Sequence, residues 1–236
     1  MTSLTLTKAE LVESVLRLKP AVAAFDCDGT LWSGDAGEGF FSWSMAQGMV
    51  SEEIERWARS RYADYKTGSV PEEVMCGEMV TMYRGLREEV VQRATDEYFA
   101  LGIAHGIFPE MRELIERLRA NGTDVWAVSS SNQWIIRSAM RHFGIPEYRI
   151  LAAETTVENG VIADRLIRVP SGPGKPDALR AALNSPPDCV FGNSVWDREM
   201  LAMSKHAFAI NPSPQLKEIA MASGWTMYQP EAKHTG

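Results

Sequence analysis

Cysteine and histidine are scarce in this sequence. Its 236 residues include three cysteines and four histidines, and neither set has the spacing of a metal-binding motif or a disulfide framework. We therefore expect no zinc site and no disulfide bonds, and this cysteine usage is typical of a reducing compartment. No apolar run reaches the roughly 18–20 residues that a membrane span needs, and residues 1–19 lack the apolar stretch of a signal peptide. These absences predict a cytoplasmic protein that does not enter a membrane.

Basic residues are also fewer than acidic residues. The chain has 24 lysine and arginine residues against 31 aspartate and glutamate residues, which gives a formal net charge of −7. Residues 33–105 hold 7 of the basic and 13 of the acidic residues, so most of the excess negative charge lies there. This balance argues against binding to nucleic acid or anionic lipid, both of which attract basic surfaces. We expect a small molecule as the partner, and the sequence leaves the oligomeric state open.

Apolar residues are present in ordinary amount, since 45% of the chain is hydrophobic and 23% is charged, as in globular proteins. The pattern predicts a capped helix over residues 7–18, a buried strand over 21–25, and helices almost throughout 35–101. After a helix at 108–119, strands are expected at 124–128, 149–152, 189–191 and 207–210, alternating with helices at 132–142, 176–183, 195–203 and 214–222. Residues 158–161 (ENGV) predict a tight hairpin turn.

This order predicts an α/β fold with a Rossmann-like parallel sheet and helices on both faces, because parallel strands need crossover connections. The helical block interrupts the alternation directly after the first strand. We therefore interpret residues 33–105 as an all-helical cap domain inserted into a catalytic core formed by residues 1–32 and 106–236. Open parallel sheets bind ligands at the carboxyl ends of their strands, so the residues just past each strand are the candidates for a functional site.

The first predicted strand ends in an acidic motif, Asp26-Cys27-Asp28-Gly29-Thr30-Leu31. Two carboxylates at a strand end can take different roles, one as nucleophile and metal ligand and the other as the acid and base beside it. The alternative is an acidic turn that only closes the strand, since aspartate and glycine are common in turns.

Polar side chains also follow later strands. Residues 129–132 (SSSN) combine hydroxyl groups with the expected start of a helix, where free backbone N–H groups suit an anion. Lys175 lies in a Gly/Pro-rich loop before a helix, and Asn193 and Asp197 stand four residues apart after another strand. Taken singly, these residues are also compatible with plain helix caps and a solvated lysine.

In this order the four segments resemble those of the haloacid dehalogenase superfamily of phosphohydrolases, and most closely its phosphoserine phosphatase-like branch. The resemblance spans residues 21–210 and includes the position of the helical insertion. It implies that Asp26 is the nucleophile, that Asp28 is the general acid and base, and that Lys175 assists catalysis. The implied phosphate-binding residues are Gly29, Thr30, Ser129, Ser130 and Lys175, and the implied Mg²⁺ ligands are Asp26, Asp28, Asn193 and Asp197. The chain departs from the family pattern at Asn193, where aspartate is usual; an amide oxygen can still bind Mg²⁺ but brings no negative charge.

The resemblance implies Mg²⁺-dependent hydrolysis of a small phosphomonoester, with a phosphoserine-like metabolite as substrate, through an aspartyl-phosphate intermediate. A metal-independent 2-haloacid dehalogenase would also use Asp26 as nucleophile, but a departing halide needs no proton, so the carboxyl group of Asp28 favours the phosphatase. A catalytically silent binding module with the same fold is the third alternative, because a fold alone does not establish activity.

Signals for the identity of the substrate are weaker and lie in the insertion. Glu38 is a candidate acceptor for an ammonium group, and Arg61, like Arg56 and Arg59, is a candidate partner for a substrate carboxylate. All four are also compatible with a solvated surface. Tryptophans near the expected entrance could form an aromatic wall for a choline-like head group or simply pack in the core; they are Trp32, Trp43 and Trp57.

Overall fold

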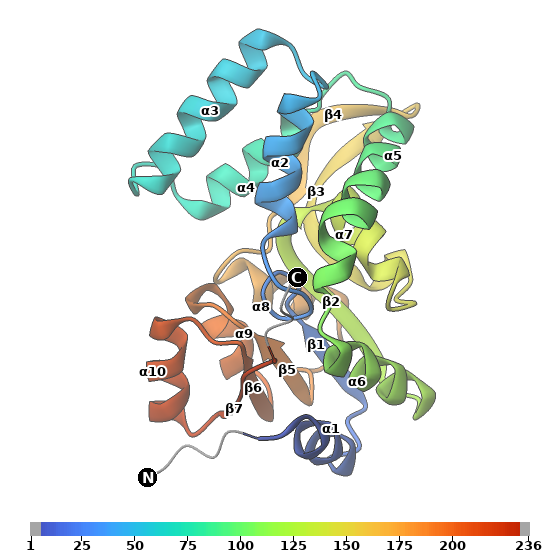
Figure 1. Ribbon diagram of the computed structural model, residues 1–236, viewed down its shortest axis with the longest axis vertical. Coiled ribbons are helices and arrows are strands. Elements are labelled where there is room, and N and C mark those ends of the chain that lie inside the picture. Colours follow the sequence, from blue (N-terminus) through green and yellow to red (C-terminus); the bar gives the residue numbers. More distant parts are fainter. Residues whose placement is uncertain (1–5, 232–236) are drawn as a thin grey trace.

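The computed structural model describes residues 6–231, and its centre is a seven-stranded sheet (Figure 1). The strands are β1 (Val22–Phe25), β2 (Asp124–Asn132), β3 (Ile150–Glu158), β4 (Val161–Arg168), β5 (Cys189–Gly192), β6 (His206–Ile210) and β7 (Thr226–Tyr228). They lie in the order β4-β3-β2-β1-β5-β6-β7, and every neighbouring pair is parallel except β3 and β4. The predicted hairpin joins these two strands, with Glu158 paired to Val161. The predicted α/β fold with a mostly parallel sheet is confirmed.

Helices lie on both faces of this sheet and above one of its edges (Figure 1). The α-helices of the described residues are α1 (Lys8–Arg17), α2 (Ala36–Ala46), α3 (Glu52–Lys66), α4 (Glu72–Thr81), α5 (Glu88–Tyr98), α6 (Pro109–Ala120), α7 (Gln133–Arg141), α8 (Gly174–Ala182), α9 (Arg198–Ala202) and α10 (Pro214–Ser223). Successive side chains of a strand point to opposite faces, so Phe25 of β1 packs in one core layer and Ala24 in the other. Helices α1, α6 and α7 cover the face of Phe25, and α8, α9 and α10 cover the face of Ala24.

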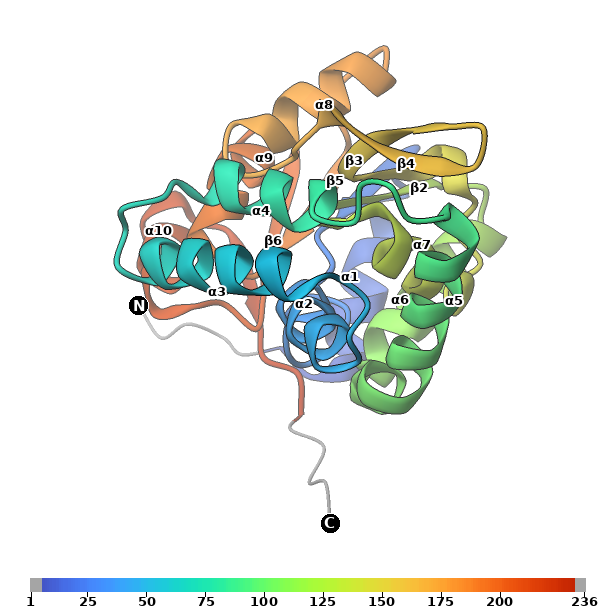
Figure 2. The ribbon, with the colours of Figure 1, turned by 90° about the horizontal axis from the view of Figure 1, so that it is seen from above.

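Helices α2 to α5 lie between β1 and α6 in the chain and above the strand ends in space (Figure 1). Figure 2 looks down on them and shows α3 and α4 side by side. The β3–β4 hairpin rises beside these helices: the backbone N–H of Gly85 donates to Ile162 at 2.8 Å, and that of Glu88 donates to Gly160 at 3.0 Å. The helical insertion after the first strand is therefore confirmed, but the cover over the strand ends also includes a hairpin from the other part of the chain.

Some element ends differ from the sequence prediction. Strand β2 runs to Asn132 instead of ending at Val128, with irregular pairing to β3 between these residues, so the three serines lie inside the strand. The predicted helix at 195–203 divides into a 3-10 turn, Val195–Asp197, and the short helix α9. Strand β7 was not predicted because three residues are too few to show an alternating pattern.

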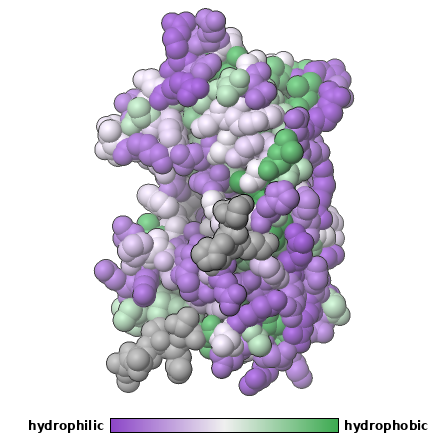
Figure 3. All heavy atoms as spheres, viewed as in Figure 1, coloured by the Kyte–Doolittle hydropathy of each residue, from purple (hydrophilic) through white to green (hydrophobic). Residues whose placement is uncertain are grey.

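The surface carries no large apolar area on the side shown in Figure 3, which is mostly hydrophilic with small, separate apolar patches. Within residues 6–231, no helix combines the length and the apolar character of a membrane span. Large apolar side chains that are exposed, such as Leu101 and Tyr148, lie on separate elements.

Three phenylalanines on neighbouring strands stack through the centre of the sheet. The ring centres of Phe25 and Phe191 are 4.1 Å apart, and those of Phe191 and Phe208 are 4.8 Å apart. Phe191 is fully buried between the other two rings. It therefore supports β1, the strand that ends at Asp26.

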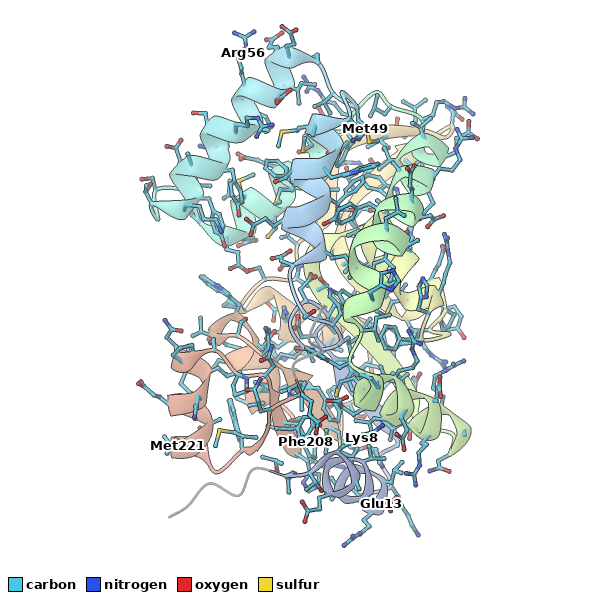
Figure 4. All side chains as sticks on the ribbon, viewed as in Figure 1. Lys8, Glu13, Met49, Arg56, Phe208 and Met221 are labelled. Carbon is cyan, nitrogen blue, oxygen red and sulfur yellow. The ribbon has the colours of Figure 1, made fainter. Side chains whose placement is uncertain are left out.

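We expect Phe191→Ala to lower the free energy of unfolding by about 3–5 kcal/mol, because the change removes buried apolar surface and leaves a cavity between two rings. Urea denaturation measures this loss. The control is Met221→Ala on the outer side of α10 (Figure 4), where the residue is 57% exposed and a change below about 0.5 kcal/mol is expected. Equal effects of the two substitutions would contradict the role of Phe191.

Candidate active site

The carboxyl ends of β1, β2 and β5 meet because these strands are neighbours in the sheet. Asp26 follows β1 directly, Ser129 lies in the last part of β2, and Asn193 follows β5. Lys175 reaches the same place from the first turn of α8. The fold thus brings together the four segments that the sequence analysis selected.

These segments form the floor of a cavity of about 500 Å³, whose roof comes from α2, α3 and α4. Asp26, Asp28 and Lys175 line the floor, and Glu38 and Lys66 line the roof. Another cavity of similar size, about 510 Å³, lies over the outer part of the sheet and contains none of these residues. The cavity at the strand ends is therefore the candidate active site.

The ammonium group of Lys175 is buried between two carboxylates. Its Nζ donates to Asp26 Oδ1 at 2.7 Å and to Asp197 Oδ1 at 2.5 Å. Lys175 is 2% exposed, and Asp197 is fully buried. Burial alone would lower the pKa of Lys175, but the carboxylates of Asp197 and Asp26 raise it above its usual value, so the ammonium group stays charged.

Asp197 is held on both of its oxygens by protein donors. Besides the contact of Oδ1 with Lys175, its Oδ2 accepts from the backbone N–H groups of Asn193 and Ser194, both at 2.9 Å. Ser194 and Asp197 also form the capping box of the turn after β5. The sequence analysis placed Asp197 among the Mg²⁺ ligands. These contacts instead engage its carboxylate in fixing Lys175 and this turn.

Asp26 has a second partner on its other oxygen. The hydroxyl of Thr30 donates to Asp26 Oδ2 at 2.7 Å. Burial and the negative charge of Asp197 raise the pKa of Asp26 to about 6, while Lys175 and Thr30 act in the opposite direction. At neutral pH Asp26 is therefore mostly ionised. Thr30, expected to bind phosphate, is fully buried and contacts the Asp26 carboxylate instead of lining the cavity.

Asp28 is fixed by three hydrogen-bond donors. The indole N–H of Trp32 and the backbone N–H of Ala36 donate to Oδ1 at 2.9 and 2.6 Å, and Ser131 Oγ lies 2.7 Å from Oδ2. Burial and the nearby charge of Asp35 raise the pKa of Asp28 to about 8, so the group is mostly protonated at neutral pH.

Gly29 is required for two geometric reasons. Its φ of +74° favours glycine, and a Cβ at this position would lie 1.9 Å from Asn193 Nδ2. The loop after Asp26 and the amide of Asn193 are thus in close contact. Asn211, to which the sequence analysis gave no role, donates to the carbonyl of Gly29 at 3.1 Å and also lines the cavity.

The serines of β2 are all at the cavity, and one of them has a role that was not predicted. Ser129 and Ser130 line the cavity, as the phosphate-binding assignment requires. Ser129 is buried, and its Oγ accepts from the backbone N–H of Ser131 at 3.0 Å. No spacing in the sequence distinguishes Ser131 from its neighbours, so its contact with Asp28 emerges only from the fold.

Of the residues in the insertion that were candidates for contact with the substrate, only some line the cavity. Glu38 lines the cavity, whereas Arg61 does not, because two hydrogen bonds of 2.7 and 2.9 Å join its guanidinium group to Glu78. Arg59 pairs with a glutamate one turn earlier, and Figure 4 shows Arg56 at the outer end of α3, pointing away from the molecule. The structure therefore does not support Arg61 as a partner for a substrate carboxylate.

The tryptophans do not form the wall that the sequence suggested. Trp32 is fully buried, Trp43 packs against Phe40, and Trp57 lines a different cavity. Among the described residues, Trp196 is the tryptophan at the active-site cavity.

The metal site has few charged ligands. Within residues 6–231, no group of three or more histidine, cysteine, aspartate and glutamate side chains is arranged to hold a metal ion. Of the ligands that the resemblance implies, Asp26, Asp28 and Asn193 line the cavity, and carboxylate, carbonyl and amide oxygens are the ligands that Mg²⁺ prefers. The buried carboxyl groups also outnumber the single buried ammonium of Lys175. This donor set fits Mg²⁺ with one charged side-chain ligand.

The sequence profile of the haloacid dehalogenase-like hydrolases matches residues 23–202, which is most of the chain. The chain therefore belongs to this family of hydrolases. Within this family, the chain is similar to proteins named phosphatase and phosphoserine phosphatase, and its fold is that of solved phosphoserine phosphatase structures.

Three known proteins illustrate this similarity. A histidinol-phosphatase of Neisseria meningitidis is 25% identical over 215 residues, which cover 86% of this chain and 96% of the relative. The phosphoserine phosphatase SerB1 of Mycobacterium tuberculosis is 28% identical over 146 residues, covering 56% of this chain and 47% of the relative. A solved structure from Bordetella pertussis, described as a protein with unknown function, has a TM-score of 0.76 at 21% identity and covers 88% of this chain and 97% of its own.

The two carboxyl groups predict a bell-shaped pH profile of kcat/KM for an alkyl phosphate such as propyl phosphate. Activity should fall below a pH of about 6, where Asp26 becomes protonated, and above a pH of about 8, where Asp28 loses its proton. Asp35→Asn removes a negative charge beside Asp28, which lowers the pKa of Asp28 and should move the upper limb to lower pH.

The matched comparison is para-nitrophenyl phosphate, whose leaving group needs little protonation. Its upper limb should be much weaker than that of propyl phosphate. Identical upper limbs for the two compounds would show that Asp28 is not the acid.

Proposed function

We propose that the protein hydrolyses a small phosphomonoester in two steps, with Mg²⁺ as cofactor and an aspartyl-phosphate on Asp26 as intermediate. The observation that carries the proposal is the difference between two neighbouring carboxyl groups. Asp26 accepts a hydrogen bond from the ammonium group of Lys175, which opposes the rise of its pKa, whereas Asp28 has no such cation beside it among the described residues and its pKa is raised further by the charge of Asp35. A nucleophile and an acid placed side by side suit transfer of a phosphoryl group.

In the first step, an oxygen of Asp26 attacks phosphorus, and the bond from phosphorus to the substrate oxygen breaks. Asp28 gives its proton to that oxygen, so the product leaves as an alcohol. A halide would leave without a proton, so an acid held by three hydrogen bonds favours the phosphatase over a dehalogenase. Lys175 and the hydroxyls of Ser129 and Ser130, which line the cavity, would bind the phosphoryl oxygens.

In the second step, Asp28, now ionised, takes a proton from a water molecule. The water oxygen attacks phosphorus, the bond between phosphorus and Asp26 breaks, and phosphate is released. Asp28 thereby regains the proton that it needs for the next substrate. Asp197 acts as a positioning residue in both steps, because it keeps Lys175 beside Asp26.

Mg²⁺ would be held by the carboxylate of Asp26, the backbone carbonyl of Asp28 and the amide oxygen of Asn193. The ion, when bound, supplies positive charge against the charge of the phosphoryl group. We further propose that residues 33–105 act as the cap domain, which limits the access of water and selects the substrate. The relatives named histidinol-phosphatase and phosphoserine phosphatase favour a phosphorylated amine as substrate.

The proposal is tested by the variant Asp26→Asn with para-nitrophenyl phosphate as substrate. We expect the variant to lose all turnover because an amide is not a nucleophile, and to remain folded because the amide oxygen can still accept the hydrogen bond of Lys175. EDTA should abolish the wild-type activity, and added Mg²⁺ should restore it. In acid-quenched reactions, label from the phosphoryl group should be found on Asp26.

Each part of the proposal would be contradicted by a different experimental result. Label on a serine or histidine would refute Asp26 as nucleophile. Undiminished activity in EDTA would refute the need for a metal, and release of halide from a haloacid would identify a dehalogenase.

A second test concerns the neutral residue at the metal site. Asn193→Asp adds a negative charge next to the proposed Mg²⁺ and should lower the Mg²⁺ concentration for half-maximal activity by roughly tenfold. The comparison is a Mg²⁺ titration of both proteins at one pH and one substrate concentration. Coinciding curves would exclude Asn193 as a ligand.

A further inference from the structure

Ser131 connects the proposed acid Asp28 with the phosphate-binding end of β2. Its hydroxyl donates to Asp28 Oδ2 at 2.7 Å, and its backbone N–H donates to Ser129 Oγ at 3.0 Å. All three residues line the active-site cavity, although Asp28 follows β1 and the two serines belong to β2. One residue therefore contacts both the proposed acid and a proposed phosphate ligand.

The two oxygens of Asp28 depend on different partners. Oδ1 accepts from the indole N–H of Trp32 and from the backbone N–H of Ala36, at 2.9 and 2.6 Å. Within residues 6–231, the hydrogen bond to Oδ2 comes from the Ser131 hydroxyl. The terminal torsion of an aspartate is soft, so a carboxyl group that is held on one oxygen can still rotate. Ser131 therefore restricts a rotation that Trp32 and Ala36 leave free.

The first turn of α2 leaves room for this hydroxyl because residue 37 is a glycine. A Cβ at position 37 would lie 2.3 Å from Ser131 Oγ and 2.9 Å from Ser131 Cβ, both too short for atoms that are not bonded. Gly37 lies in a helix, where glycine is less favourable than alanine, and its φ is not positive. The close approach of Ser131 is therefore a physical reason for glycine here.

Proton transfer requires the kind of alignment that these contacts provide. An acid must lie within roughly 2.6–3.2 Å of the oxygen that it protonates, and a small displacement lowers the rate. Ser131 is bonded to Asp28 on one side and to Ser129 on the other, so it fixes the acid relative to the proposed phosphate ligand. If the hydroxyl only joined β2 to α2, its loss would affect all substrates alike.

We infer that Ser131 is a positioning residue for the two proton transfers of Asp28. Its hydroxyl fixes the plane of the Asp28 carboxyl group, its backbone ties that group to Ser129, and Gly37 provides the space that the hydroxyl needs. This assignment rests on the proposed function, because it takes Asp28 as the acid and base.

The test compares two substrates that differ in their need for an acid. Propyl phosphate releases an oxygen that must be protonated, whereas para-nitrophenyl phosphate has a leaving group that needs little protonation. In Ser131→Ala, kcat/KM should fall by about 30-fold for propyl phosphate and by about threefold or less for para-nitrophenyl phosphate. This parameter reports formation of the aspartyl-phosphate, the step in which the leaving group departs.

The aspartyl-phosphate itself gives a second readout. Asp28 also takes the proton of the attacking water, so Ser131→Ala should slow breakdown of the intermediate with either substrate. With labelled para-nitrophenyl phosphate, formation stays fast while breakdown is slowed. Acid-quenched samples at steady state should therefore carry label on Asp26 in a larger fraction of the variant than of the wild type.

Three further variants complete the comparison. The matched control is Ser44→Ala, which removes a buried hydroxyl of α2 that pairs with Tyr83 outside the cavity and should keep the wild-type ratio of the two kcat/KM values. Ser130→Ala removes a proposed phosphate contact and should lower both values by similar factors. Gly37→Ala retains Ser131 but displaces its hydroxyl, and should lower kcat/KM for propyl phosphate about tenfold more than that for para-nitrophenyl phosphate.

The outcomes separate this role of Ser131 from the proposed function. Equal losses for the two substrates in Ser131→Ala, or no loss for either, overturn the role while the proposed function stands. If Ser131→Ala does not fold, Gly37→Ala decides in the same way. No turnover of either compound by the wild type, or label on a residue other than Asp26, refutes the proposed function and the role of Ser131 with it.

Discussion

Lys175 donates hydrogen bonds to Asp26 and Asp197, and its burial makes both contacts necessary. A buried ammonium group without partners is strongly unfavourable, and so is a buried carboxylate left alone. The three residues come from the first turn of α8, the end of β1 and the turn after β5. One ion cluster therefore fixes how three separate segments meet, and it includes Asp26, the proposed nucleophile. The contacts that stabilise the cluster also hold the Asp26 carboxylate in place.

The different protonation of Asp26 and Asp28 also follows from this arrangement. Asp26 is buried and Asp28 is partly buried, and this burial favours the neutral form of each carboxyl group. Only Asp26 has a buried cation as a neighbour, and Lys175 keeps it closer to its usual pKa. Asp28 has hydrogen-bond donors and the negative Asp35 around it, so it retains its proton to higher pH. Two residues of one type, two positions apart, thus acquire opposite roles from their surroundings alone.

The sequence predicts the parts of this site that depend on local pattern. The buried apolar strand before Asp26 and the alternation of strands with helices define a parallel sheet, and such a sheet brings its strand ends together. Side-chain pairing across the fold has no such local signal. The contact of Ser131 with Asp28 depends on how far β2 continues, and that of Arg61 with Glu78 depends on how α3 packs against α4. Asp197 was assigned to the metal because the family resemblance implied it. The backbone N–H groups that hold it become visible only in the folded turn.

Charge balance connects the neutral Asn193 with the acidic roof. A phosphomonoester brings negative charge into a cavity that Asp26, Glu38 and Glu72 already make negative. An aspartate at position 193 would add to the repulsion of the phosphoryl group while it strengthened the binding of Mg²⁺. With asparagine at this proposed ligand position, the attraction for Mg²⁺ would be weaker, and so would the repulsion of a phosphoryl group. At the other end of the cavity, Glu38 and two tyrosine rings surround the ammonium group of Lys66. The neutral side chain of Asn193 therefore limits the negative charge at the end of the cavity where the proposed phosphoryl group would bind.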